Sequence, residues 1–200
     1  NKSLAVGSNL YVVNGGGGTV SVTDTLTDTV SATISVGTTP IALASLGHKL
    51  YVANSASNTV SIIDMQTNLV VGTISIGAGP NNMSVVGTKV YTSNNGNSTV
   101  SAIDTSTDTV VATITIPAGV SPFYQTSVGA KLYVTGNNTN TKIAVIDTTT
   151  DTVVATPLIN TGYHAVAVGT KVYVSDYTSS ISVVDSTTDD IVDVIPTSVN

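Results

Sequence analysis

The chain has 200 residues, of which 41% are hydrophobic, and this is enough for one globular domain with a buried core. All its charges come from 12 Asp and 6 Lys, so the formal net charge is −6 and no basic face is available for nucleic acid or anionic membranes. The absence of Cys excludes disulfides and thiolate metal sites, and no apolar run approaches the roughly 18 residues of a membrane-spanning helix.

A tyrosine recurs along the whole chain at intervals of about 40 residues. Each time it opens a similar phrase, in which two runs rich in Val, Ile and Thr are joined by a polar turn. The tyrosines are Tyr11, Tyr51, Tyr91, Tyr133 and Tyr173, and the phrases cover residues 9–24, 49–64, 89–104, 131–147 and 171–185.

Two further strand-like segments accompany each phrase. A β-branched run follows after a polar turn, as in NLVVGTISIG at 68–77 and DTVVATITIP at 108–117. A shorter run of small residues ending in glycine leads into the next tyrosine, as in PIALASLG at 40–47 and PNNMSVVG at 80–87. No segment keeps a 3.6-residue period, so we predict no helices. Each repeat therefore predicts four short strands, which we name A to D in chain order.

Four-stranded antiparallel units at this spacing are typical of propeller blades, which bury both sheet faces against their neighbours. We predict a single all-β β-propeller domain over residues 1–200, with blades at approximately 1–39, 40–79, 80–119, 120–162 and 163–200. The end of the chain followed by its start reads IPTSVN-NKSLAVGSNLY, nearly in phase with the internal repeats. Two explanations fit this phase: a closed five-bladed ring, or five blades of a longer array.

The motif at the second strand resembles the YVTN β-propeller repeat family of archaeal surface-layer proteins and bacterial exported proteins. It stands as YVVN at 11–14, YVAN at 51–54 and YTSN at 91–94, and weakens to YVTG at 133–136 and YVSD at 173–176. The resemblance implies a propeller whose motif residues are structural. Related propellers include lactonase-like and streptogramin-lyase-like enzymes, but no catalytic motif outside the repeat can be carried over from them.

Acidic residues recur in pairs in the turn between strands C and D. We interpret them as turn residues that accept hydrogen bonds from their own backbone. A glycosidase would need a unique carboxylate pair, and a good calcium site about six oxygens. The turn positions are Asp24 and Asp28, Asp64 and Asn68, Asp104 and Asp108, Asp147 and Asp151, and Asp185 and Asp189.

The chain has only two imidazoles, His48 and His164, and neither is accompanied by the His or Cys ligands of a zinc site. We therefore predict no catalytic residue, no metal site and no cofactor. Two Asn-x-Ser/Thr tripeptides, at Asn97 and Asn137, lie in predicted B–C loops and are the expected glycosylation sites of an exported protein.

One feature departs from the repeat at the start of strand A. Two successive positions there read Phe123-Tyr124 in blade four and Tyr163-His164 in blade five, where the other blades have no aromatic residue. In propellers the D–A and B–C connections share one face, so we expect these residues to gather at one side of the channel mouth. The expected cluster is Phe123, Tyr124, Tyr163, His164, Asp176 and Tyr177. Such a cluster suits a sugar or peptide ligand, and the alternative is that the aromatics fill space near the axis.

From these observations we predict a non-catalytic extracellular propeller. It would be a structural or binding module of a cell-surface layer, sheath, filament or adhesive assembly, with protein, glycan or self-association as its partners. The first alternative is a lectin-like binder of glycans or peptides at the channel mouth. The second is a lyase- or lactonase-type enzyme, which should show a unique cluster of acid, base or metal ligands.

Overall fold

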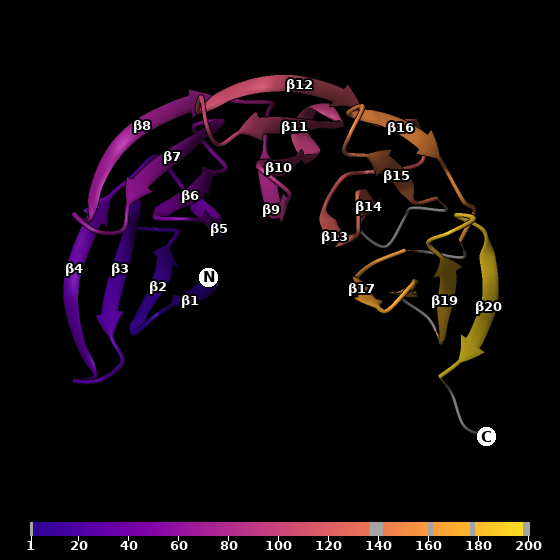
Figure 1. The fold of residues 1–200 in the computed structure, drawn as a ribbon, viewed down its shortest axis with the longest axis horizontal. Coiled ribbons are helices and arrows are strands. Elements are labelled where there is room, and N and C mark those ends of the chain that lie inside the picture. The colour runs from indigo at the N-terminus through magenta and orange to yellow at the C-terminus, as the bar shows by residue number, and fades with distance from the viewer. Residues whose placement is uncertain (1, 137–141, 160–161, 177–178, 198–200) are drawn as a thin grey trace.

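The computed structural model describes residues 2–136, 142–159, 162–176 and 179–197. These residues form five four-stranded antiparallel sheets, each with its strands in chain order, as predicted for the blades. Figure 1 shows the sheets following one another around an arc, with their last strands along the outer rim.

The strand bounds are as follows. Blade one holds β1 (Ser3–Val6), β2 (Asn9–Asn14), β3 (Thr19–Asp24) and β4 (Thr29–Ser35). Blade two holds β5 (Pro40–Leu46), β6 (Lys49–Asn54), β7 (Thr59–Asp64) and β8 (Leu69–Ser75). Blade three holds β9 (Pro80–Val86), β10 (Lys89–Asn94), β11 (Thr99–Asp104) and β12 (Thr109–Thr115). Blade four holds β13 (Tyr124–Val128), β14 (Lys131–Thr135), β15 (Ala144–Asp147) and β16 (Thr152–Ala155). Blade five holds β17 (Ala165–Val168), β18 (Lys171–Ser175), β19 (Ser180–Asp185) and β20 (Ile191–Pro196).

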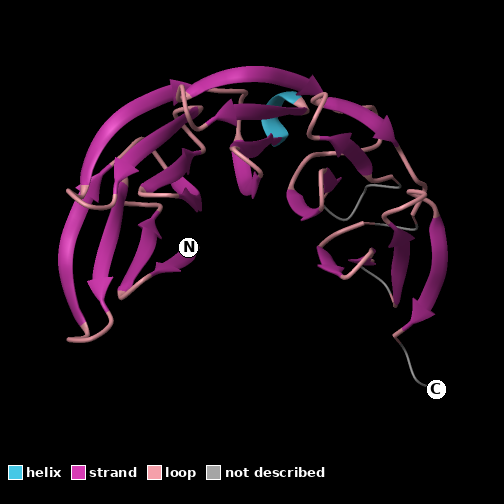
Figure 2. Ribbon diagram, viewed as in Figure 1, coloured by secondary structure: helices cyan, strands magenta, loops and turns pink. Residues whose placement is uncertain are grey.

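Helix is almost absent from the described residues, as Figure 2 shows. A single 3-10 turn, η1 (Asn95–Asn97), lies in the B–C loop of blade three. It was not predicted, and it is too short to produce a helical period in the sequence. None of the helical structure in the described part of the chain is long and apolar enough to cross a membrane.

The turn between strands A and B explains why each strand A ends in glycine. Two residues connect the strands, and the first of them, such as Gly47, has a φ of +61°. A two-residue hairpin of the II′ kind needs this backbone conformation at its first position, which glycine adopts without a steric penalty. The same left-handed glycine recurs in the other four blades.

The hydrophobic core lies between the blades rather than inside one of them. Each core cluster joins the tyrosine-bearing face of one sheet to the opposite face of the next, as where Tyr51 and Ile62 meet Val90 and Ile103. The tyrosines of the first four blades, Tyr11, Tyr51, Tyr91 and Tyr133, are at most 1% exposed. Burial of these rings against the next blade therefore stabilises the packing of neighbouring blades.

The arc does not close on itself. Figure 1 shows blade one and blade five apart, with an open gap between them. Of the two arrangements considered from the sequence, the closed five-bladed ring is therefore not the one adopted. The number of blades alone does not set the angle between one blade and the next.

Candidate functional site at the inner strands

The predicted aromatic residues of blades four and five do lie against one another. The ring of Tyr124 is at the centre, with centroid distances of 5.0 Å to Phe123, 5.1 Å to Tyr163 and 5.2 Å to His164. The rings meet at tilted or edge-on angles, which is the preferred geometry of aromatic pairs. Four of the six predicted residues therefore form one cluster at the start of the inner strands.

Hydrogen bonds fix the cluster on both strands. The hydroxyl of Tyr124 donates to that of Tyr163 at 3.2 Å, and Thr135 Oγ1 donates to the carbonyl of Tyr163 at 2.7 Å. The bond to Tyr163, together with burial, raises the pKa of Tyr124 to about 12. The imidazole of His164 is exposed, whereas Phe123, Tyr124 and Tyr163 are half-buried. The cluster thus presents aromatic and imidazole surface that is accessible from solvent.

The other two predicted residues stand differently. Asp176 Oδ1 accepts hydrogen bonds from the backbone N–H groups of Ser179 and Ser180, both at 2.8 Å, and the hydroxyl of Ser180 donates to Oδ2. The carboxylate therefore binds Ser179 and the first residue of β19, Ser180. Tyr177 lies outside the described residues. The ligand-binding role of the cluster remains a prediction.

Two polar residues of other blades occupy the position that Tyr124 has in blade four, and the sequence reasoning assigned them to no site. Lys2 Nζ donates to Asn82 Oδ1 at 2.8 Å, joining blades one and three. Desolvation by burial lowers the pKa of Lys2. The alignment of strand-A positions already placed both residues level with Tyr124, so that signal could have identified them.

The first acidic residue of each C–D turn serves the turn, as predicted. Asp104 Oδ1, for example, accepts from the backbone N–H of Ser106 at 2.7 Å and from its hydroxyl at 2.6 Å. The side-chain and backbone bonds from Ser106 hold the pKa of Asp104 below its usual value. The carboxylates of Asp24, Asp64, Asp147 and Asp185 likewise accept from the N–H two residues later.

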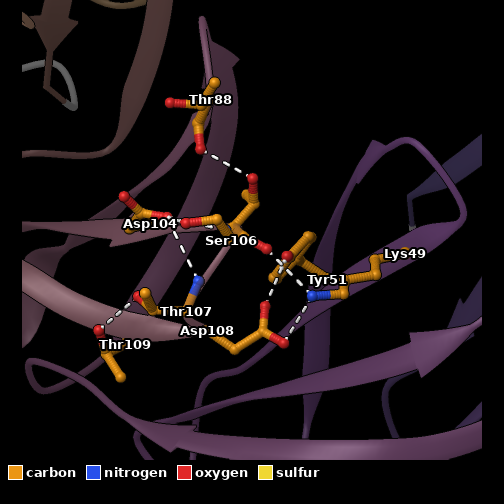
Figure 3. Close-up of polar contacts among 9 residues, drawn as sticks. Lys49, Tyr51, Thr88, Asp104, Ser106, Thr107, Asp108 and Thr109 are labelled. Carbon is orange, nitrogen blue, oxygen red and sulfur yellow. Dashed lines mark hydrogen bonds and ion pairs between the residues drawn. The ribbon is translucent and has the colours of Figure 1, made fainter.

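In blades three, four and five, the second acidic residue has a role beyond the turn role that was predicted. Its backbone does occupy a turn position, with φ of 55° at Asp108, but its carboxylate reaches the preceding blade. Lys49 Nζ lies 2.7 Å from Asp108 Oδ2, and the hydroxyl of Tyr51 donates to Oδ1 at 2.9 Å (Figure 3). We call this arrangement the interblade tie: Lys and Tyr on strand B, and Asp on the C–D turn of the next blade.

The interblade tie recurs along the arc. Lys89 Nζ lies 2.6 Å from Asp151 Oδ2, and the hydroxyl of Tyr91 donates to Asp151 Oδ1 at 2.6 Å. Lys131 and Tyr133 bind Asp189 at 2.7 and 2.6 Å. Burial and the bound carboxylate raise the pKa of the tyrosine well above its ordinary value in all three ties. Spacing within one repeat could not predict these contacts, because each joins residues 56 to 62 positions apart.

The first interface is a neutral variant of the same arrangement. Asn9 stands at the lysine position and Asn68 at the aspartate position, with φ of 57° at Asn68. Both charges are therefore replaced together, and Tyr11 remains buried. Among the described residues, the buried Oδ1 of Asn68 has no hydrogen-bond partner.

A cavity of about 300 Å³ lies at the opposite end of the strands from the aromatic cluster. It is lined by the A–B turns of blades three and four and by the C–D turn of blade four, including Gly87, Lys89, Gly129 and Thr148. Within the described ranges, no group of three or more His, Asp or other acidic side chains could hold a metal ion. Of the two predicted glycosylation sites, Asn97 is exposed in η1 and Asn137 lies outside the described residues.

The fold is shared with several solved structures. The match to hydrazine synthase from Kuenenia stuttgartiensis covers 90% of this chain and 60% of the synthase chain, with 22% identity and a TM-score of 0.75. The match to BamB from Moraxella catarrhalis covers 98% of this chain and 60% of BamB, with 16% identity and a TM-score of 0.78. The match to the Pan2 WD40 domain of Neurospora crassa covers 95% of this chain and 63% of that domain's chain, with 13% identity and a TM-score of 0.73.

No protein-family model matches the chain, and no curated protein matches it in sequence. The chain spans about 60% of the length of these three structural relatives. At such low sequence identity the likeness concerns the architecture and not the activity. The chain has the β-propeller fold.

Proposed function

We propose that this chain is a non-catalytic structural or binding module of an extracellular cell-surface assembly, such as a layer, sheath, filament or adhesin. Most of the charged side chains recur at the same positions from blade to blade, and this repetition carries the proposal. Asp104 and its equivalents hold turns, and Asp108 and its equivalents join blades. An enzyme needs an asymmetric set of acid, base or metal ligands, whereas a scaffold needs the same contact many times.

Composition and accessibility support the surface location. The chain combines few charges with abundant Thr, Ser, Asn and Gly and has no Cys to be oxidised. Its second-strand motif resembles the YVTN repeats of exported proteins. An exposed Asn97 begins the tripeptide Asn97-Ser98-Thr99, which suits glycosylation during export.

The surface location can be tested on intact cells of the source organism. We expect an antibody against the chain to label intact cells as strongly as permeabilised cells, and protease added outside the cell to remove the label. A cytoplasmic protein labelled only after permeabilisation serves as the control. Labelling of this chain that also requires permeabilisation would contradict the proposed location.

The aromatic cluster favours a second candidate function, a lectin-like binder of glycans or peptides. The half-buried rings of Phe123 and Tyr163 and the exposed imidazole of His164 lie at centroid distances of 5.0 to 5.2 Å from the ring of Tyr124. Aromatic faces beside hydrogen-bonding groups are suited to sugar rings and extended peptides. A glycan and peptide array tests this function directly. Binding that Tyr124→Ala abolishes and Tyr11→Phe preserves would support it, and binding unchanged in Tyr124→Ala would place the ligand elsewhere.

A further inference from the structure

Tyr124 and Tyr163 meet through the parts of their side chains that react when tyrosine is oxidised. Tyr124 begins β13, and Tyr163 lies just before β17, the neighbouring inner strand in Figure 1. The ring centroids are 5.1 Å apart, and the hydroxyl of Tyr124 donates to that of Tyr163 at 3.2 Å. The unpaired electron of an oxidised tyrosine resides largely on its oxygen and on the ring carbons beside the C–O carbon. Because the two oxygens are in contact, the ring edges that carry these carbons also lie near one another.

The backbone holds the two tyrosines in this position through a shared neighbour, Thr135. Tyr124 is the cross-strand partner of Thr135 in the ladder between β13 and β14. The hydroxyl of Thr135, which is fully buried, donates to the carbonyl oxygen of Tyr163 at 2.7 Å. The N–H of Tyr163 also donates to the carbonyl oxygen of Ser175 at 3.0 Å. A reaction between the two rings therefore starts from groups that are already positioned, which is the condition for a large proximity effect.

The tyrosines of the repeat motif differ from this pair in accessibility. Four of them are at most 1% exposed: Tyr11, Tyr51, Tyr91 and Tyr133. Three of their hydroxyls are also bound to the aspartates of the interblade ties. Tyr124 and Tyr163 are half-buried, so a small oxidant can reach them. Among the described residues, theirs is also the only contact between two tyrosine rings.

The other two members of the aromatic cluster do not compete in the same way. Phe123 has no hydroxyl, so it cannot form a phenoxyl radical by losing an electron and a proton. His164 contacts the ring of Tyr124 at a centroid distance of 5.2 Å, but the hydroxyl of Tyr124 is directed to Tyr163. Tyr163 is therefore the phenol that a radical on Tyr124 meets first.

We propose that Tyr124 and Tyr163 are an oxidative modification site, at which a peroxidase supplied with hydrogen peroxide joins the two rings as a dityrosine. Each phenol gives up one electron and its hydroxyl proton. The two phenoxyl radicals form a carbon–carbon bond between the ring carbons beside their C–O carbons. The hydrogens on these carbons leave as protons and the oxygens are protonated again, which restores two phenols. The pair loses two electrons and two protons in all, and these reduce one hydrogen peroxide to two water molecules.

The new bond would join blades four and five at the inner end of their interface. The existing tie between Lys131, Tyr133 and Asp189 lies at the start of β14, whereas Thr135 and the tyrosine pair lie at its end. The cross-link closes a loop between positions 39 residues apart, and such a loop restricts the unfolded chain. This inference goes beyond the proposed function, since it requires neither a ligand in the cluster nor a location at the cell surface.

Photo-oxidation of the dilute 200-residue chain with a ruthenium tris-bipyridyl complex tests the site. Persulfate accepts the two electrons and becomes two sulfate ions. We expect the monomer to acquire the fluorescence of dityrosine and to lose the mass of two hydrogen atoms. Tyr124→Phe and Tyr163→Phe should each lower the dityrosine yield of the monomer at least about tenfold, because the remaining tyrosine has lost its positioned partner. Tyr173→Phe is the matched control, since it removes another half-buried tyrosine, and it should leave the yield unchanged.

Tryptic digestion identifies which tyrosines are joined. Cleavage after lysine gives a peptide 90–131, which contains Tyr91 and Tyr124, and a peptide 143–171, in which Tyr163 is the sole tyrosine. The cross-link should join these two peptides. Its loss in Tyr124→Phe excludes Tyr91, and its loss in Tyr163→Phe excludes a bond to the adjacent His164. The purified cross-linked monomer should melt at least about 5 °C above the unmodified chain.

Several results would overturn the inference. One is a monomer without dityrosine, or with dityrosine that appears only in cross-linked dimers. Another is a yield that both phenylalanine variants leave unchanged. A link from peptide 143–171 to peptide 172–200, or a link to peptide 90–131 that persists in Tyr163→Phe, would assign the reaction to other residues. Melting curves of the variants establish that each is folded before oxidation, because phenylalanine keeps the ring and removes only the hydroxyl.

Discussion

The sharpest prediction concerns the energetic value of a single interblade tie. Asp151 accepts hydrogen bonds from Lys89 and Tyr91 at 2.6 Å each, and the side chains of Lys89 and Asp151 are 22% and 13% exposed. Replacing Asp151 by Asn keeps the size and the tolerance of positive φ but removes the charge. The change in the free energy of unfolding therefore reports on the interblade tie rather than on the turn in which Asp151 lies.

The magnitude follows from the contacts. A hydrogen bond to a charged group contributes about 1.5–3 kcal/mol, while a solvent-exposed ion pair contributes at most about 1 kcal/mol. This tie contains two charge-assisted bonds but is partly exposed, so we expect Asp151→Asn to lower the free energy of unfolding by about 2 kcal/mol. For a chain of this length, that corresponds to a fall in Tm of about 4–8 °C.

Asp28→Asn is the matched control. Asp28 has the same turn position and nearly the same φ, 54° against 55°, but no ion-pair partner among the described residues. We expect Asp28→Asn to change the free energy of unfolding by less than about 0.5 kcal/mol. Thermal and urea unfolding of both variants provide the measurement.

The neutral first interface supplies a further comparison. The double variant Lys89→Asn/Asp151→Asn reproduces the Asn9 and Asn68 arrangement, so it should be less destabilised than the sum of the two single variants. Equal losses for Asp151→Asn and Asp28→Asn would assign the effect to the turn. A negligible loss for Asp151→Asn would refute the energetic role of the tie.

Three further predictions concern the turn, the cluster and the core. Asp104→Ala should lower Tm at neutral pH, because the variant loses the hydrogen bonds that Ser106 donates to the carboxylate. These bonds lower the pKa of Asp104, so the stability that they contribute should be lost as pH falls below about 4. Acid unfolding of the unmodified chain and the variant would show this loss. In a spectrophotometric titration of the tyrosines, Tyr124 should ionise near pH 12, and Tyr163→Phe should move that midpoint towards 10; an unchanged midpoint would refute the assigned cause. Since folding raises this pKa, its contribution to stability should be complete below pH 10 and lost as pH rises through 12. Tyr133→Ala should cost about 3–5 kcal/mol of stability, whereas Tyr163→Ala should cost clearly less because its ring is half-buried; equal losses in Tm would return the cluster to a packing role.

Tertiary structure changed the interpretation of the acidic turns in one specific way. The pattern Asp104-x-x-x-Asp108 indicates a turn, and both residues do occupy one. A pattern within one repeat cannot show which side chain faces the turn and which faces a neighbour 57 residues away. The strand-B lysine carried the missing signal, because lysine and aspartate are replaced together by Asn9 and Asn68 at the first interface.

The sequence by itself determined the strands, the blades and the inner-strand row of aromatic residues. These depend on local rules, namely alternation of β-branched residues, glycine at the A–B hairpin and a constant repeat length. Only the tertiary structure decided that the arc stays open, that Tyr124 contacts Tyr163 across two blades, and that Lys49 binds Asp108 (Figure 3). These features depend on the angle between packed sheets, and that angle is set by how side chains from different repeats fill the space between blades.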